Sequence, residues 1–285
     1  MKAIHLASIV LTLVSFGFAA EAAQPGPDPA QEALAAEAQT KAAESSSGSS
    51  SAISTCAFTF SSGSGVNSLK YCVTANGNIT QFEAPQGHEH IAVGAFSEGY
   101  GICDLNANIA YFDYADSGDS DNWGPATVAN QGTKSVKIVR TTSDGLWTLT
   151  QTITLATGTP PMADITMTLK NNSSIQKSVR LIRFADVDAD GTFNNNFDGT
   201  VNSAFGWNSF GATHAFGMVL LNVGKTIFAH GGYGQNVAFG PSPCDPFTHT
   251  NFSTSGGIDG SIAHFYTIDV AKGSTATVKV AYKGL

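Results

Sequence analysis

The sequence predicts an all-β protein, a large antiparallel β-sandwich of about a dozen strands preceded by a disordered N-terminal linker. Apolar and polar residues alternate with a period of two in several segments, as expected for strands with one packed and one solvated face. Turn dipeptides, Asp144-Gly145 and Asn76-Gly77, separate neighbouring alternating runs. From Cys56 to Leu285, no segment has the 3.6-residue apolar period of an amphipathic helix.

Residues 1–22 have the pattern of a signal peptide. Lys2 supplies positive charge, residues 9–18 form an apolar run too short to span a bilayer, and small residues follow at cleavage spacing. We expect cleavage after Ala19 or Ala22, with no lipid attachment, because no cysteine lies near that point. The mature chain has no long apolar segment, so we expect a secreted protein without a membrane span, in the extracellular space or the periplasm.

Residues 23–55 are predicted to form the disordered linker. They are rich in Ala, Glu and Ser and contain no aromatic residue, so they cannot bury enough apolar surface to offset chain entropy. Two interpretations remain: a spacer that holds the domain away from a surface or partner, or a tail without a role.

Residues 56–285 are predicted to form one β-sandwich domain, because no second linker divides this stretch. Charged residues make up 13% of the chain and the formal net charge is −8. This mildly acidic balance argues against nucleic acid and anionic membrane surfaces as partners.

Period-two alternation and turn residues locate the strands. In residues 147–155, Trp147, Leu149, Ile153 and Leu155 share one face and four threonines share the other. Short turns between such strands imply two packed antiparallel sheets, and the pattern leaves open whether they form a sandwich or a closed barrel. The candidate segments are residues 71–82, 91–96, 108–114, 135–155, 163–172, 178–187, 216–222, 225–231, 261–270 and 274–283.

The cysteines indicate two disulfides. Cys56, Cys72, Cys103 and Cys244 are an even number in a chain with an export signal, and three pairings are possible. We favour Cys56 with Cys72 and Cys103 with Cys244, where the second bridge closes the longer loop and has the larger entropic effect.

An acidic loop, residues 184–200, is the strongest chemical candidate. Asp186, Asp188 and Asp190 alternate and precede Gly191, as a loop that wraps a calcium ion requires. The flanks are strands and position twelve is Phe197, so this is not an EF-hand. The alternative is an acidic turn neutralised by Arg180 and Arg183. The predicted calcium ligands are Asp186, Asp188, Asp190, Asn194 and Asp198, with the carbonyl of Thr192 as a further oxygen.

Three other groups of residues are weaker candidates. Residues 113–122 form a second acidic loop with irregular spacing, which is typical of a solvated turn. His88 and His90 lack a third ligand at metal-site spacing. Glu83, Glu89 and Glu98 would suit glycoside chemistry only at a separation that the sequence does not give.

Two aromatic residues beside small polar ones, Trp123 and Trp207, are the predicted binding residues. Exposed aromatic rings with polar neighbours can stack on sugars, whereas buried ones are plain core packing.

The sequence favours a binding function over catalysis. It contains no G-x-S-x-G, H-E-x-x-H or phosphate-loop motif. The leading hypothesis is a secreted, calcium-stabilised binding module for an extracellular glycan or protein. The alternatives are a secreted polysaccharide-active enzyme, with no catalytic residue assigned, and a structural envelope or surface protein.

Overall fold

The structure, a computed structural model, describes residues 56–91, 98–115, 119–208, 216–224, 228–235, 242–245 and 257–285. The predicted signal peptide and linker lie outside the described residues. The described part is an all-β protein with seventeen strands and no α-helix, and every strand pair is antiparallel. The predicted fold class is confirmed, with more strands than expected because short edge strands carry little alternation.

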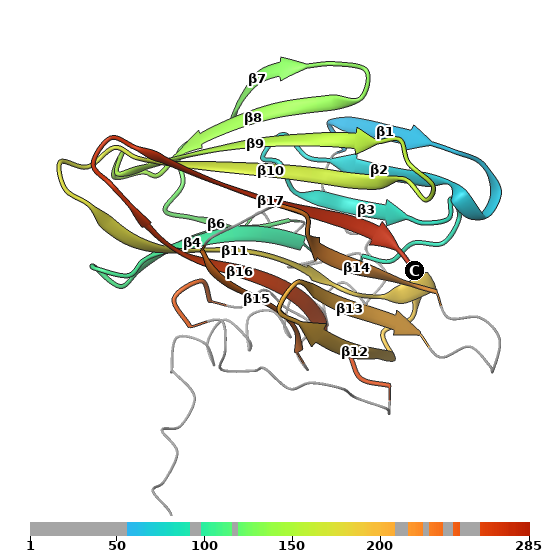
Figure 1. Cartoon of the computed structure of the whole chain (residues 1–285). Helices are drawn as coiled ribbons and strands as arrows, with labels where there is room; N and C mark the ends of the chain where they lie inside the picture. Colours follow the sequence, from blue (N-terminus) through green and yellow to red (C-terminus); the bar gives the residue numbers. More distant parts are fainter. Residues whose placement is uncertain are drawn as a thin grey trace, which may run out of the picture.

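The largest sheet has eight strands and contains the alternating segments that were clearest in the sequence (Figure 1). In spatial order they are β12 (Asn195–Thr200), β13 (Ser203–Asn208), β14 (Gly217–Asn222), β17 (Thr275–Gly284), β10 (Met162–Asn171), β9 (Trp147–Ala156), β8 (Ser135–Thr141) and β7 (Thr127–Gln131).

A six-stranded sheet faces the large sheet, and a three-stranded sheet lies beside them (Figure 1). The six strands are β15 (Ala229–Gln235), β16 (Ser261–Val270), β11 (Lys177–Asp186), β4 (Glu98–Asp104), β5 (Ile109–Tyr114) and β6 (Asp119–Asp121). The small sheet consists of β1 (Phe58–Ser62), β2 (Leu69–Val73) and β3 (Ile79–Glu83). Two 3-10 turns, η1 (Gly65–Asn67) and η2 (Ala189–Gly191), complete the described elements.

The core lies between the inner faces of the sheets. In β9 buried and half-buried residues alternate without a break, and Trp147, Leu149, Ile153 and Leu155 are all buried, as predicted. The hydrophobic effect therefore fixes the face that β9 turns inward, because a slip of one residue would bury the threonines instead.

A buried polar network joins the three sheets inside the sandwich. Arg183 of β11 donates from Nε to Glu98 of β4, from Nη1 to Gln151 of β9 and from Nη2 to the carbonyl of Gly77. Glu98 also accepts a hydrogen bond from the hydroxyl of Tyr282 at 3.0 Å. Because buried charge is costly unless paired, this network fixes how the sheets meet.

Both predicted hairpin dipeptides form turns. Gly77 and Gly145 have φ values of 94° and 75°, which favour glycine. A Cβ on Gly77 would lie 2.6 Å from Nε2 of Gln151, so the hairpin between β2 and β3 also needs a residue without a side chain there.

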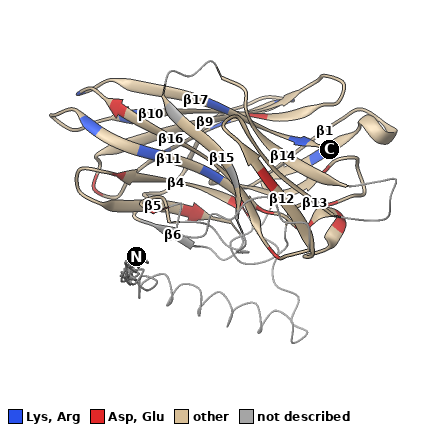
Figure 2. Ribbon diagram, turned by 60° about the horizontal axis from the view of Figure 1, so that its bottom comes forward, with Lys and Arg blue, Asp and Glu red and all other residues tan. Residues whose placement is uncertain are grey.

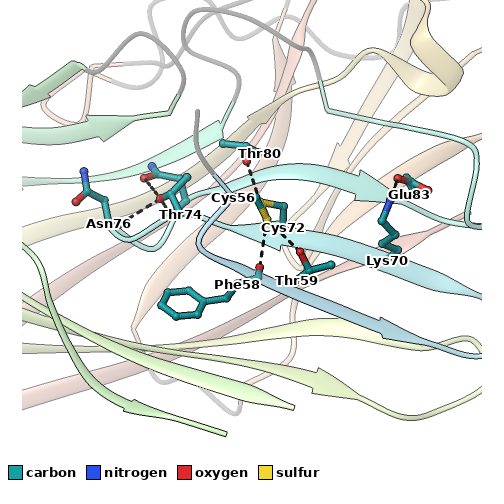
Figure 3. Close-up of a disulfide and its surroundings, with 10 residues drawn as sticks. Cys56, Phe58, Thr59, Lys70, Cys72, Thr74, Asn76, Thr80 and Glu83 are labelled. Atoms are coloured by element: carbon teal, nitrogen blue, oxygen red, sulfur yellow. Dashed lines mark hydrogen bonds and ion pairs between the residues drawn. A yellow bond between two sulfur atoms is a disulfide. The ribbon is translucent and has the colours of Figure 1, made fainter. Parts of the chain in front are cut away.

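The two disulfides have the favoured pairing. Cys56–Cys72 joins the start of the described chain to β2, beside Phe58 and Thr59 (Figure 3). Cys103–Cys244 joins β4 to residues 242–245, and Nη1 of Arg180 donates to the carbonyl of Cys244 at 2.7 Å. The second bridge thus holds this short segment against the face of β4 that turns away from the main core.

In the described ranges, no helix has the length and hydropathy needed to cross a bilayer.

Candidate metal centre

Three carboxylates meet where β11 ends. One oxygen from each of Asp186, Asp188 and Asp259 lies within 4.8 Å of the other two. A calcium ion binds oxygens at about 2.3–2.6 Å, so two ligands on opposite sides of it are about 5 Å apart. The three side chains therefore fit around one such ion.

Strand register brings Asp259 to this site. In the ladder between β11 and β16, Asp186 is opposite Ser261. The ladder continues for one more hydrogen bond, from the amide of Val187 to the carbonyl of Gly260 at 3.0 Å. Asp188 and Asp259 therefore come opposite each other, although they are far apart in the sequence.

Asp186, the last residue of β11, is buried with one carboxylate oxygen unpartnered. Asp186 is only 4% exposed, and its Oδ1 has no hydrogen-bond partner. Burial and the charges of Asp188 and Asp259 raise the pKa of Asp186 well above its usual value. Burial and the charge of Asp259 raise the pKa of Asp188 to about 6. A cation among the three carboxylates would remove this cost.

Two of the five predicted ligands, Asp186 and Asp188, are in the cluster. Asp190 turns away and places Oδ1 2.7 Å from Nδ1 of His88. Asp198 is exposed on β12, where it accepts a hydrogen bond from its neighbour Gly199. Asp190 and Asp198 are thus outside the cluster, and their role as ligands is not part of this site. Asn194 is exposed, with its Cβ near Gly257, and its role as a ligand stays a prediction.

The arginines do not neutralise the cluster, contrary to the alternative interpretation. Arg183 is buried in its pair with Glu98, and Arg180 donates to the carbonyl of Cys244. Neither arginine is among the causes that shift the pKa values of Asp186 and Asp188, which are burial and the neighbouring carboxylates.

The two predicted binding tryptophans differ in exposure. Trp123 is 8% exposed, with its ring against Tyr100 and Tyr111 and the guanidinium of Arg140 5.5 Å from its centroid. Trp123 is therefore mostly covered by the core, and its role in binding stays a prediction. Trp207 is half-buried on β13.

Trp207 shares its strand face with a second aromatic residue. Phe205, also half-buried, is two residues earlier on β13, so the two Cα atoms are about 6.7 Å apart. Across the ladder, Asn196 is opposite Trp207 and Asp198 is opposite Phe205. Two aromatic rings and two polar side chains thus lie together on this face, which we call the β12–β13 face.

The β12–β13 face and the carboxylate cluster are at the same end of the sandwich. Asn208, the neighbour of Trp207, donates from Nδ2 to the carbonyl of Ala189 at 3.0 Å. Ala189 in turn follows Asp188. In Figure 1, β12 and β13 are at the lower edge of the molecule beside β15, with which they are in contact.

The glutamates considered for catalysis are all engaged elsewhere. Glu83 pairs with Lys70 at the surface, as Figure 3 shows, and Glu98 pairs with Arg183 in the core. Glu89 accepts hydrogen bonds from the backbone amides of Phe82, His90 and Ile91. These contacts leave no free pair for acid and base catalysis among the three.

Among the described side chains, neither His88 and His90 nor Asp113 of the second acidic loop belongs to a group that could hold a metal ion. His90 uses both ring nitrogens, Nε2 to the carbonyl of Ala84 and Nδ1 as acceptor for the amide of Asp190. Asp113 is buried in an ion pair with Arg140. Asp116 lies outside the described residues, as do the side chains of Asp119 and Asp121.

Acidic residues are spread over several elements of the ribbon, and one of them is on β12 (Figure 2). Among the described residues, three carboxylates come close enough together to hold an ion at the end of β11.

Fold and site together define a class, an antiparallel β-sandwich with a buried acidic cluster at one end. No protein-family model and no curated protein matches the chain. Among solved structures, it is similar to a bacterial glucoamylase in complex with acarbose, with a TM-score of 0.53 and 13% identity over 82% of this chain. The match covers 32% of the glucoamylase chain, and at this identity it shows the fold alone.

A second similar structure is a putative aldose 1-epimerase from Escherichia coli K12. It has a TM-score of 0.41 and 9% identity over 80% of this chain and 99% of that chain. This score is too low to support an argument about function.

Proposed function

We propose that the chain is an exported β-sandwich module that binds an extracellular glycan, and that calcium bound by Asp186, Asp188 and Asp259 orders its binding end. The observation that carries the proposal is the carboxylate of Asp186, which is buried against two other acids with one oxygen unpartnered. A hard divalent cation with a preference for carboxylate oxygens satisfies that arrangement.

Two observations favour a glycan over a protein as the ligand. Trp207 and Phe205 offer partly exposed rings beside the exposed Asp198, which suits the apolar face and the hydroxyls of a sugar. The similar glucoamylase was solved in complex with acarbose, and we extend a carbohydrate ligand to this chain as part of the proposal.

Calcium is expected to raise the melting temperature of the wild-type protein relative to the same protein in chelator. At about 100 times the dissociation constant, the ion adds about 2.7 kcal/mol to the free energy of unfolding. For a domain of this size that is a rise of about 5–10 °C, measurable by differential scanning calorimetry.

Asp188→Asn should abolish this rise, because it removes a ligand. Asp198→Asn is the matched control, since it changes the charge equally at an exposed site outside the cluster. Equal melting temperatures of the wild type in chelator and in millimolar calcium would remove the ion from the proposal.

Trp207→Ala is expected to weaken glycan binding by about tenfold or more, because it removes a stacking ring. Affinity electrophoresis of the full chain against a panel of polysaccharides measures the effect. Trp207→Phe should keep most of the affinity, and Ile175→Ala, a change at an exposed residue in the turn after β10, should keep all of it.

Equal affinity of wild type and Trp207→Ala would contradict the proposed surface. New reducing ends released from the same polysaccharides would instead assign the chain to the enzymes.

A further inference from the structure

The ion site has one buried side and one open side. Asp186 is buried, Asp188 is half-buried and Asp259 is exposed. Asp186 and Asp188 come from the end of β11, whereas Asp259 comes from the segment before β16. The carboxylates thus approach the ion from the protein, and the side next to Asp259 faces solvent.

Charge and coordination number limit what can occupy the open side. Three carboxylates carry a formal charge of −3, which already exceeds the +2 of a calcium ion. Calcium takes six to eight oxygens, and three carboxylates that each bind through one oxygen leave about three or more positions. Those positions favour neutral oxygens, because a phosphate or a uronic acid would add negative charge to an anionic site.

An aromatic pair is held by the loop that carries Asp188. The rings of His88 and Phe216 are stacked, with centroids 4.0 Å apart and planes 14° apart. His88 is held by Asp190, and its side chain remains 35% exposed. Asp190 is two residues after Asp188, so their Cα atoms are at most about 7 Å apart.

Asp190 in η2 connects the loop to both His88 and His90. Asp190 has a left-handed conformation, with φ 57° and ψ 35°, which non-glycine residues rarely adopt. Its amide donates to Nδ1 of His90, which fixes the loop, and its carboxylate pairs with His88, which joins the aromatic pair to the loop that carries Asp188.

We infer that the ion is itself part of the glycan-binding surface, and that two adjacent hydroxyls of a neutral sugar bind directly to it while the C–H face of the sugar packs on His88 and Phe216. This inference rests on the proposed function and deepens it. Calcium then binds the sugar directly, in addition to stabilising the fold.

Terbium in place of calcium provides a direct test on the full chain. Luminescence lifetimes in H2O and D2O count the O–H groups bound to the ion. Soluble starch, yeast mannan and laminarin serve as neutral probes, and polygalacturonate as the anionic one. When two waters are exchanged for two hydroxyls, the apparent number of bound waters falls by about one. We expect this fall with at least one neutral probe and not with polygalacturonate.

Two pairs of variants assign the effect to residues. Asp259→Asn should weaken terbium binding by tenfold or more, whereas Asp269→Asn, at an exposed position of β16 outside the cluster, should leave it unchanged. His88→Ala should weaken binding of the neutral probe by about tenfold with terbium affinity retained, and His88→Phe should restore it.

Each failure has a distinct signature. A neutral probe that binds without changing the number of bound waters overturns the inference and leaves the proposed function intact. Binding of polygalacturonate alone, or of none of the probes, also overturns the inference. Absence of terbium and calcium binding removes the ion itself, and with it the metal part of the proposed function.

Discussion

Glu98→Gln is expected to lower the free energy of unfolding by about 3–5 kcal/mol, the usual cost of leaving one member of a buried ion pair without its partner. Glu98 and Arg183 are both 0% exposed, and Oε1 of Glu98 lies 2.5 Å from Nε of Arg183. Arginine does not give up its proton in proteins, so the glutamine variant retains a full positive charge in the core.

The loss should extend beyond the ion pair. Oε2 of Glu98 also accepts a hydrogen bond at 2.7 Å from the amide of Ile79, and thereby holds β3 against β4. Burial raises the pKa of Glu98, and the charge of Arg183 opposes that rise. The carboxylate is thus stabilised mainly by its partner, which is why substitution on one side alone is costly.

Urea denaturation followed by tryptophan fluorescence measures this effect. Glu83→Gln is the matched control, because its pair with Lys70 is partly solvated and should contribute less than about 1 kcal/mol. The double variant Glu98→Gln with Arg183→Met should recover part of the loss, since it removes the orphaned charge. A change below about 1 kcal/mol for Glu98→Gln would show that the pair does not stabilise the fold.

Removal of the Cys103–Cys244 disulfide by substituting alanine at both positions should destabilise the protein by up to about 5 kcal/mol. The two cysteines are separated by 141 residues, so the bridge closes a long loop and lowers the entropy of the unfolded chain more than a short loop would. Cys103 is fully buried, and alanine is the smallest replacement that leaves the β4 ladder intact.

The Cys56–Cys72 bridge is the internal control for this prediction. Its separation of 16 residues predicts a smaller loss of about 3 kcal/mol when both cysteines become alanine. Thermal or urea unfolding of the two double variants compares the bridges directly. A larger loss for Cys56–Cys72 would contradict the entropic argument.

Local pattern was enough for the strands and turns. The alternation in residues 147–155 placed Trp147 and Leu149 inside, because a strand with one packed face has a period of two whatever lies opposite it. Gly77 and Gly145 marked the hairpins, since their positive φ is a local property. The pairing of the cysteines was favoured on loop length, a quantity that is also read along the chain.

Local sequence pattern predicted only part of the candidate site. Asp186 and Asp188 stood out because they alternate at the end of a strand. Asp259 did not, because its place beside Asp188 depends on the register between β11 and β16. Asp190 is outside the cluster, and its contact with His88 joins residues 102 apart in the sequence.

What the sequence determined by itself was the all-β class, the inward face of each clear strand and the sites of the tight turns, because period and backbone conformation are local. Only the tertiary structure decided that Trp123 is covered while Trp207 is partly open, that Arg183 pairs with Glu98, and that Asp259 completes the carboxylate cluster. Those outcomes depend on which strands become neighbours, and the hydrophobic pattern of one strand does not specify its partner.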